Sequence, residues 1–574
     1  MTRKLQMRRL HSYRKLLTIA AAGALAAVVA ACGSSGAGSG SNSNASGNSS
    51  ARALVMESSP ETSITDDFNP YATTQAPYGM GATGLIYEPL VEFNLASTTV
   101  QYPWLASSYA WSNGGKSITF TIRQGVKWND GTPFTPADVA YTYNLMKQNA
   151  SINLGGLTIS SVSTSGDTVT LTFATAQYSN LENIAGVGIV PQHIWSKAGN
   201  PATFTDPKPV GTGPYELGTF TQQGYTLVKN PHYWQPAKVK VAKVYFPAYT
   251  TNNGALTALY SGQIDWTGNY IPGLQQKFVA PDPAHHHYYE AANGDESLEP
   301  NLTKWPLSDL AVRKAVSLAV DRTVLGKEGE AGLENPVTNA TGLTLPAFQA
   351  WSAPVASMTV SAHSSTTAAE NVLKAAGYTK GSNGFFQKNG KTVAFTIISP
   401  TAYTDMAEVD SIAAQELRAA GIDATFQGLS TNAWNADVAS GNFQMTEHWS
   451  NGGISPFAQY NGWLNSSLAT GSSATGDFER LNDPALDADL ATLAGANTVS
   501  QQSQLLVPLE KYVAANLPVI PLETAAEWFE YNSQHFVGWP TQANPYESGQ
   551  PSGTNNGPGS GTDLVVILHL SPAS

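Results

Sequence analysis

The chain has 574 residues, long enough for more than one hydrophobic core, so a multidomain protein is expected. Six of its 30 basic residues fall within the first 31 positions, where no acidic residue occurs. The remaining body has 24 basic and 42 acidic residues, a net charge of −18, which argues against nucleic acid as a partner. The single cysteine, Cys32, excludes an internal disulfide and a cysteine-based metal cluster.

Residues 1–31 predict a signal peptide, because a basic segment precedes a largely apolar run of 14 residues, Leu16–Val29. Val29-Ala30-Ala31-Cys32 resembles the lipobox of bacterial lipoproteins, in which the cysteine becomes the lipidated first residue of the mature chain. An ordinary cleavage site followed by a chance cysteine is the alternative. Residues 32–52, which are rich in Gly, Ser and Asn, would then be the lipidated cysteine and a flexible linker.

The stretch 102–144 predicts a hairpin followed by a capped helix. Ser117–Arg123 alternates apolar and polar residues, as a half-buried strand does, and turn signals stand at 113–115 and 129–131. Thr135-Pro136-Ala137-Asp138 then supplies an N-cap, a proline at the first helical position and an acidic third residue.

The literal residues of this stretch resemble the signature of the family 5 extracellular solute-binding proteins. They read Leu-Ala-x-x-x-x-Trp-Ser-x-Gly, and then Phe-Thr-Ile-Arg-x-Gly-Val-Lys-Trp-x-Asp-Gly-x-Pro-Phe-Thr-x-x-Asp-Val. Members of this family are the ligand-capturing subunits of ABC importers for oligopeptides, dipeptides, nickel and some oligosaccharides. Segments on both sides of this stretch extend the resemblance, at 67–71, 84–91, 189–195, 209–217, 225–234 and 255–266.

Helices and strands alternate through the rest of the chain, which predicts a mixed sheet with crossover helices. Helices are expected over 306–322, 368–377 and 411–421, and strands over 53–56, 168–173, 393–398, 423–426, 518–522 and 564–568.

The resemblance implies an α/β, periplasmic-binding-protein-like fold, with two lobes of mixed sheets plus a third inserted domain. Domain I would be discontinuous, domain II inserted in it, and the ligand would bind between domains I and III, which close by hinge motion. The predicted boundaries are 53–88, 206–283 and 521–574 for domain I, 89–205 for domain II and 284–520 for domain III.

Residues 447–456 occupy the place of the family's ligand-contacting loop. Peptide-binding members resemble Trp-x-x-Asp there, and that Asp pairs with the α-ammonium of the peptide. Here Gly452 takes the place of the Asp, and a buried ammonium without a carboxylate partner would be costly. This departure favours a neutral, hydroxyl-rich ligand such as a sugar over a peptide with a free N-terminus.

Aromatic and neutral polar residues at and near this loop would suit such a ligand, although each aromatic residue could instead be part of the core. Trp449 and Trp463 flank the loop and are the strongest candidates. The expected ligand-binding residues are Tyr71, Trp449, Asn451, Ser455, Tyr460, Trp463 and Trp539.

Catalytic and metal-binding motifs are missing from the sequence. It contains no Gly-x-Ser-x-Gly, His-Glu-x-x-His or Walker A pattern, so we expect neither an enzyme nor a cofactor. The run His285-His286-His287 is expected to be surface and strand-edge histidines, since neighbours on a strand point to opposite faces and cannot share one ion.

The sequence therefore predicts a monomeric substrate-binding lipoprotein of an ABC importer, anchored at the cell surface or in the periplasm. It would capture an oligopeptide or oligosaccharide outside the cell and deliver it to membrane permease subunits. A surface sensor or adhesin that reuses the fold is the alternative from another class, and an extracellular hydrolase is a third.

Overall fold

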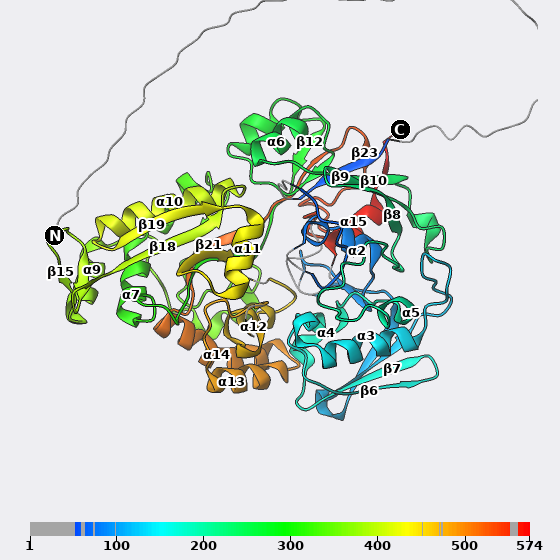
Figure 1. The fold of residues 1–574 in the computed structure, drawn as a ribbon, viewed down its shortest axis with the longest axis horizontal. Helices are drawn as coiled ribbons and strands as arrows, with labels where there is room; N and C mark the ends of the chain where they lie inside the picture. Colours follow the sequence, from blue (N-terminus) through cyan, green and yellow to red (C-terminus); the bar gives the residue numbers. More distant parts are fainter. Residues whose placement is uncertain are drawn as a thin grey trace, which may run out of the picture. The chain divides into compact units, whose positions relative to one another are not determined.

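The structure is a computed structural model (Figure 1). Several predictions fall outside the described residues: the signal peptide (1–31), Cys32, the linker up to Ala51, and Asn451. Within the described part, every helix is too short or too polar to cross a membrane. The described residues are 52–58, 63–72, 75–97, 99–450, 452–469, 471, 474–551 and 561–573.

The first sheet has seven strands, in the order β12-β22-β11-β1-β10-β9-β8. Its central strand, β1, pairs in parallel with β10 and β11, and the other pairs are antiparallel. The sheet is therefore mixed, as expected, and it collects strands from both ends of the chain. The strands are β1 (Leu54–Glu57), β8 (Tyr215–Thr221), β9 (Gly224–Lys229), β10 (Lys243–Pro247), β11 (Trp266–Thr267), β12 (His286–Tyr288) and β22 (Glu530–Asn532).

A four-stranded antiparallel sheet contains the predicted hairpin. Its order is β4 (Ala106–Ser112), β5 (Ser117–Ile122), β7 (Thr168–Phe173) and β6 (Ile159–Ser165). The alternation in β5 places Ile118, Phe120 and Ile122 on one face, and all three side chains are buried. They join a continuous apolar core that this sheet shares with the seven-stranded sheet.

Helix α3 (Pro136–Gln148) packs against β6 and β7 and begins as predicted. The Asp138 carboxylate accepts hydrogen bonds from the backbone N of Thr135 at 2.9 Å and from its hydroxyl at 3.0 Å. The other carboxylate oxygen accepts from the backbone N of Gln192 at 3.1 Å. Asp138 thus caps α3 and also fixes the start of α5 (Gln192–Trp195).

The third large sheet has six strands, in the order β14-β21-β13-β20-β18-β19. Helix α10 (Thr404–Ala419) lies along β18 and β19 (Figure 1), and α7 (Leu310–Ala319) packs against α9 (Thr366–Ala375). These elements enclose a second apolar core. The strands are β13 (Ala291–Pro300), β14 (Asn335–Pro336), β18 (Ala394–Pro400), β19 (Asp423–Leu429), β20 (Met445–Trp449) and β21 (Ile520–Glu527).

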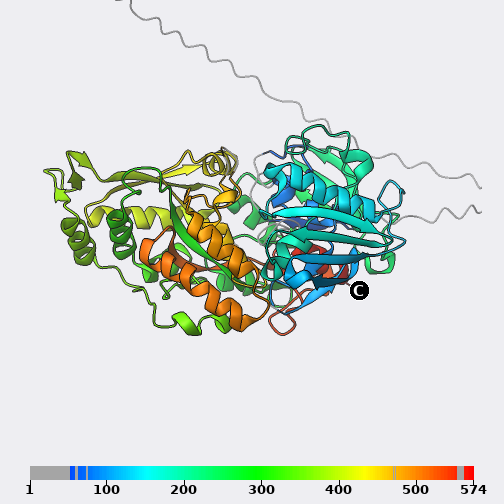
Figure 2. The same cartoon turned by 90° about the horizontal axis from the view of Figure 1, so that it is seen from below.

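Helices α12 (Phe457–Leu464), α13 (Pro484–Ala494) and α14 (Val499–Asn516) surround a third apolar core, and α13 and α14 lie side by side (Figure 2). Shorter elements complete the fold. The small sheets comprise β2 (Val91–Phe93) and β3 (Gln101–Pro103), β15 (Thr379–Lys380), β16 (Phe386–Lys388) and β17 (Lys391–Thr392), and β23 (Phe536–Val537) and β24 (Ser571–Pro572). The remaining α-helices are α1 (Ala76–Gly79), α2 (Ala82–Ile86), α4 (Leu181–Ala185), α6 (Asn252–Tyr260), α8 (Arg322–Val324), α11 (Thr431–Ser440) and α15 (Thr562–His569).

The chain passes from the seven-stranded to the six-stranded sheet between β12 and β13, and returns between β21 and β22. The two passages are neighbours, because Ala291 at the start of β13 pairs with Glu527 at the end of β21. Residues 289–290 and 528–529 therefore link the sheets. The division into three domains remains a prediction. The sheets differ from the predicted boundaries for two strands. β12, predicted in domain III, lies in the sheet of the domain I strands, and β21, predicted almost entirely in domain I, lies in the sheet of the domain III strands.

Two sequence-based expectations are wrong. Residues 564–568 belong to helix α15 rather than to a strand. This helix is buried along almost its whole length and packs against α2, and a short run of apolar residues looks the same in a buried helix and a buried strand. Helix α10 starts at Thr404, well before the predicted start at 411. No side chain caps its N-terminus, so the start lacks the strongest sequence signal, although Asp405 stands in the first turn.

Replacing the capping residue of α3 should weaken the fold. We expect D138A to lower the free energy of unfolding by about 1–2 kcal/mol, because it removes the hydrogen-bond acceptor for two elements. Chemical denaturation followed by circular dichroism measures this. D167A, at an exposed turn residue between β6 and β7, serves as the control, and equal losses for both variants would contradict the assignment.

Candidate ligand-binding site

The segment between β20 and α12, which we call the 450–456 loop, is held from behind by buried polar side chains. The Ser450 hydroxyl accepts a hydrogen bond from the backbone N of Asp295 in β13, at 2.8 Å. The Gln459 amide nitrogen lies 2.7 Å from the carbonyl of Gly342, 3.0 Å from the Thr344 hydroxyl and 3.2 Å from the Ser450 hydroxyl. The start of the loop is thus fixed to both β13 and the 342–344 segment.

Glu182 of α4 contacts the other side of this loop. One carboxylate oxygen accepts a hydrogen bond from the backbone N of Ile454 at 3.0 Å. Gly453 has φ +125°, and a Cβ atom there would lie 2.5 Å from the same oxygen, so only glycine permits this approach. Burial raises the pKa of Glu182 to about 8, against the smaller opposite effect of the hydrogen bond to Ile454. No sequence motif marks Glu182, which is therefore absent from the predicted site residues.

A second contact adjoins the first. The Ser179 hydroxyl lies 3.0 Å and 2.8 Å from the carbonyl oxygens of Leu493 and Ala496, and the Gln502 amide donates to that hydroxyl at 2.8 Å. The segment 179–182 therefore contacts both the 450–456 loop and the helices α13 and α14.

Aromatic side chains gather at the end of β20, beside the loop. The half-buried Trp449 ring has its centroid 5.7 Å from that of Trp434 and 6.4 Å from that of Tyr403. The His448 ring is 4.4 Å from the Trp449 ring and 4.8 Å from the Phe478 ring. Desolvation lowers the pKa of His448 to about 4, so its ring is neutral near pH 7. Four of the five rings are partly exposed, and none of the five side chains carries a charge near pH 7.

The other predicted residues near the loop are buried. The Ser455 hydroxyl accepts from the backbone N of Phe457 at 3.4 Å, at the start of α12. Tyr460 donates to the carbonyl of Thr341 at 2.9 Å, and its ring packs edge-on against Trp463. The indole N–H of Trp463 has no hydrogen-bond partner among the described residues.

Tyr71 and Trp539 lie in the large core shared by the first two sheets. The Tyr71 hydroxyl donates to the carbonyl of Gly188 at 2.8 Å. Trp539 donates to the carbonyl of Phe536 at 2.8 Å and stacks on Tyr531, with ring centroids 4.9 Å apart. The structure thus brings Trp449, Ser455, Tyr460 and Trp463 together around one loop, and places the other two residues elsewhere.

The three consecutive histidines have separate partners. His285 pairs with Asp282 at 2.9 Å, the His286 ring stacks on Phe278, and His287 contacts the carbonyl of Ala284 at 3.2 Å. They do not converge on one point.

Comparison with known proteins identifies the family. The family model described as bacterial extracellular solute-binding proteins, family 5 middle, matches residues 101–471, more than half of the chain. The chain belongs to this family. The resemblance inferred from the motifs and the α/β binding-protein fold are therefore confirmed, and the chain is a solute-binding protein.

Individual relatives of this family 5 protein have different ligands in their names. The chain is 24% identical to the periplasmic murein peptide-binding protein MppA of Escherichia coli (strain K12), over 76% of this chain and 82% of that protein. It is 30% identical to the nickel-binding periplasmic protein of the same organism, over 45% of this chain and 50% of that protein. A periplasmic oligopeptide-binding protein from Thermotoga maritima, crystallised with mannohexaose, has a similar fold, with a TM-score of 0.82 and 22% identity over 91% of this chain and 98% of that one.

Removing the Glu182 carboxylate should loosen the 450–456 loop. We expect E182A to increase amide hydrogen exchange in residues 452–464 about tenfold, because the hydrogen bond to Ile454 is lost. E182Q keeps a carbonyl oxygen at the same place and is the matched control. Equal exchange in E182A and the unmodified protein would show that Glu182 does not hold the loop.

Proposed function

We propose that this family 5 protein is the substrate-binding subunit of an ABC importer and that its ligand is a neutral oligosaccharide. The cluster of uncharged, partly exposed aromatic rings beside the 450–456 loop is the main observation in favour. Indole and phenol rings stack on the flat faces of sugar rings, and neutral polar groups match their hydroxyls. An oligopeptide is the second candidate, favoured by the name of MppA.

The hydrogen bonding of Glu182 supports the preference for a sugar. Gly452 supplies no carboxylate, and the carboxylate of Glu182, which meets this loop, already accepts a hydrogen bond from Ile454. Its raised pKa favours the neutral acid, which would be a poor partner for a peptide ammonium. The mannohexaose bound by the Thermotoga maritima protein is consistent with this choice.

Capture would proceed by closure of two lobes about the links at 289–290 and 528–529. Two contacts would belong to the closed form. One joins Glu182 to the 450–456 loop, and the other joins Ser179 to the region of helices α13 and α14. A ligand lying against both sides would add contacts only in that form, and so would shift the equilibrium toward closure. The closed form would then be what the permease subunits recognise.

Ligand screening tests this proposal. We expect mannohexaose or cellohexaose to raise the melting temperature by several degrees, about 3 °C or more at saturation, and tetra-alanine to leave it unchanged. W449A should lose the shift, whereas W111A, at a half-buried tryptophan of β4, should keep it. Stabilisation by the peptide alone would reject the sugar assignment in favour of the second candidate.

We further propose that Cys32 carries a lipid and anchors the protein at the outer face of the membrane. Expression of C32S in the native host should release most of the protein into the soluble fraction, because the acyl chains supply the membrane affinity. Immunoblots of membrane and soluble fractions measure this. Unchanged membrane association of C32S would contradict the anchor.

The alternatives from other classes predict different partners and products. Co-purification with permease subunits favours an importer over a surface sensor or adhesin. We propose no catalytic activity, and the release of products from oligosaccharides or peptides incubated with the protein would indicate a hydrolase instead.

A further inference from the structure

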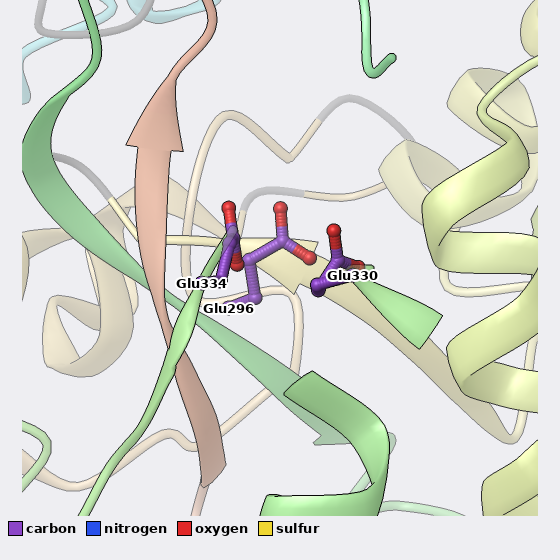
Figure 3. Close-up of side chains that lie close together, drawn as sticks. All are labelled: Glu296, Glu330 and Glu334. Carbon is purple, nitrogen blue, oxygen red and sulfur yellow. The ribbon is translucent and has the colours of Figure 1, made fainter. Parts of the chain in front are cut away.

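Seven buried acidic side chains lie together beside β13 and β21, the two strands that adjoin the links between the seven-stranded and six-stranded sheets. One oxygen from each of Glu296, Glu330 and Glu334 lies within 4.8 Å of the others, and Figure 3 shows these three carboxyl groups close together. We call the whole group the crossover carboxyl cluster. Its members are at most 8% exposed: Glu296, Glu330, Glu334, Asp405, Asp410, Glu447 and Glu523.

The sheet register explains why these residues meet. Glu523 of β21 stands directly opposite Glu296 of β13, so the two side chains share one face of the sheet. Glu447 of β20 stands opposite Leu298, two residues along β13 on the same face. Asp405 and Asp410 come from α10, and the remaining two glutamates from the segment before β14.

Few of these carboxyl groups have a conventional partner. Both oxygens of Glu330, Glu447 and Glu523 lack a hydrogen-bond donor among the described residues. The Ser399 hydroxyl faces Asp410, and Asp405 accepts from the backbone N of Met406 at 2.9 Å. Glu334 accepts from the backbone N of Ala526 at 2.7 Å. A few backbone donors therefore cannot compensate for seven negative charges.

The charged and titratable groups that face the cluster from neighbouring elements do not neutralise it. Arg322 of α8 approaches Glu523, but its guanidinium donates to the carbonyls of Ser317 and Pro521 at 3.1 and 2.8 Å. Tyr270 donates to the carbonyl of Gly329 at 2.8 Å. Glu408, which also faces Tyr270, would only add negative charge.

We propose that the crossover carboxyl cluster is a proton-binding site, and that protons shared between its carboxyl groups hold the linking strands together in an acidic medium. A protonated carboxyl group donates one O–H hydrogen bond and so turns a repulsive neighbour into an acceptor. Glu296 and Glu447 lie close enough for such a bond. This inference concerns stability and does not depend on which ligand is bound.

The pKa shifts agree with the geometry. Burial is the largest cause in every case, and it raises the pKa of Asp405 to about 6, of Asp410 to about 7 and of Glu296 to about 8. Because these pKa values are higher in the folded state, the cluster stabilises the fold fully below the carboxyl pKa of the unfolded chain, near pH 4. This contribution is lost as the pH rises through about 6 to 8.

Protons explain the pattern better than a metal ion, because the same pattern recurs elsewhere. Glu299, Asp477 and Glu479 are 1–2% exposed and lie close to one another beside Arg480. Four of their six carboxylate oxygens lack a hydrogen-bond donor among the described residues. Among the described residues, only Glu296, Glu330 and Glu334 bring three possible metal ligands within 4.8 Å. A proton can serve both clusters, whereas a metal ion would serve one.

Thermal unfolding of the full chain in EDTA tests the proposal. We expect the melting temperature to fall by about 10 °C between about pH 5 and about pH 8. E296Q/E447Q/E523Q keeps the side-chain shapes without the acidic protons, and should roughly halve this fall. D167N/E328Q, at two exposed positions, should retain the whole fall.

A melting temperature that is constant or rises over this pH range in the unmodified protein would overturn the proposal, even if the triple variant failed to fold. Recovery of stability near pH 8 on adding Ca²⁺ or Mn²⁺, lost in the triple variant, would overturn it in favour of a cation site. Neither result would bear on the ligand, since no ligand is present in these experiments.

Discussion

Two neighbouring antiparallel strands, β13 and β21, carry the chain from the seven-stranded sheet into the six-stranded sheet and back again. Every described strand between residues 291 and 527 belongs to the six-stranded sheet or to the small three-stranded one. We therefore propose residues 289–290 and 528–529 as the hinge between these two sheets. The two links lie next to each other, because the ends of β13 and β21 pair.

The 450–456 loop depends on the same strands. β20 pairs with β13, and Ser450 holds the backbone of Asp295 in β13 through its hydroxyl. On its other side the loop meets Glu182, which comes from the part of the chain that shares its core with the seven-stranded sheet. Strand β13 thus connects the proposed ligand contacts to the proposed hinge, through its pairing with β20 and the hydrogen bond from Asp295 to Ser450.

Local signals in the sequence predicted the local structure well. The turn at 113–115, the alternation in β5 and the Thr135–Asp138 cap each lie within a few residues, and the hairpin and α3 form as expected. The signature residues also gave the family and its fold. Helix α15 was mistaken for a strand because its apolar run carries no periodicity that distinguishes the two.

The long-range features could not be predicted in this way. Glu182 reaches the 450–456 loop across more than 270 residues, and nothing in its own neighbourhood indicates that contact. The crossover carboxyl cluster draws its members from positions 296 to 523, and only the strand register brings them together. Several of the predicted aromatic residues fill cores. The sequence could not show this, because a tryptophan in a core and a tryptophan in a binding site look alike in sequence.

The distance between the two sides of the molecule, with and without ligand, is the most direct test of the central claim that closure captures a ligand. Exposed Ser163 on β6 and exposed Ser382 between β15 and β16 can be changed to cysteine in a C32S background and labelled for single-molecule energy transfer. Our account predicts a shorter distance when mannohexaose is added. An unchanged distance with a ligand that demonstrably binds would contradict it.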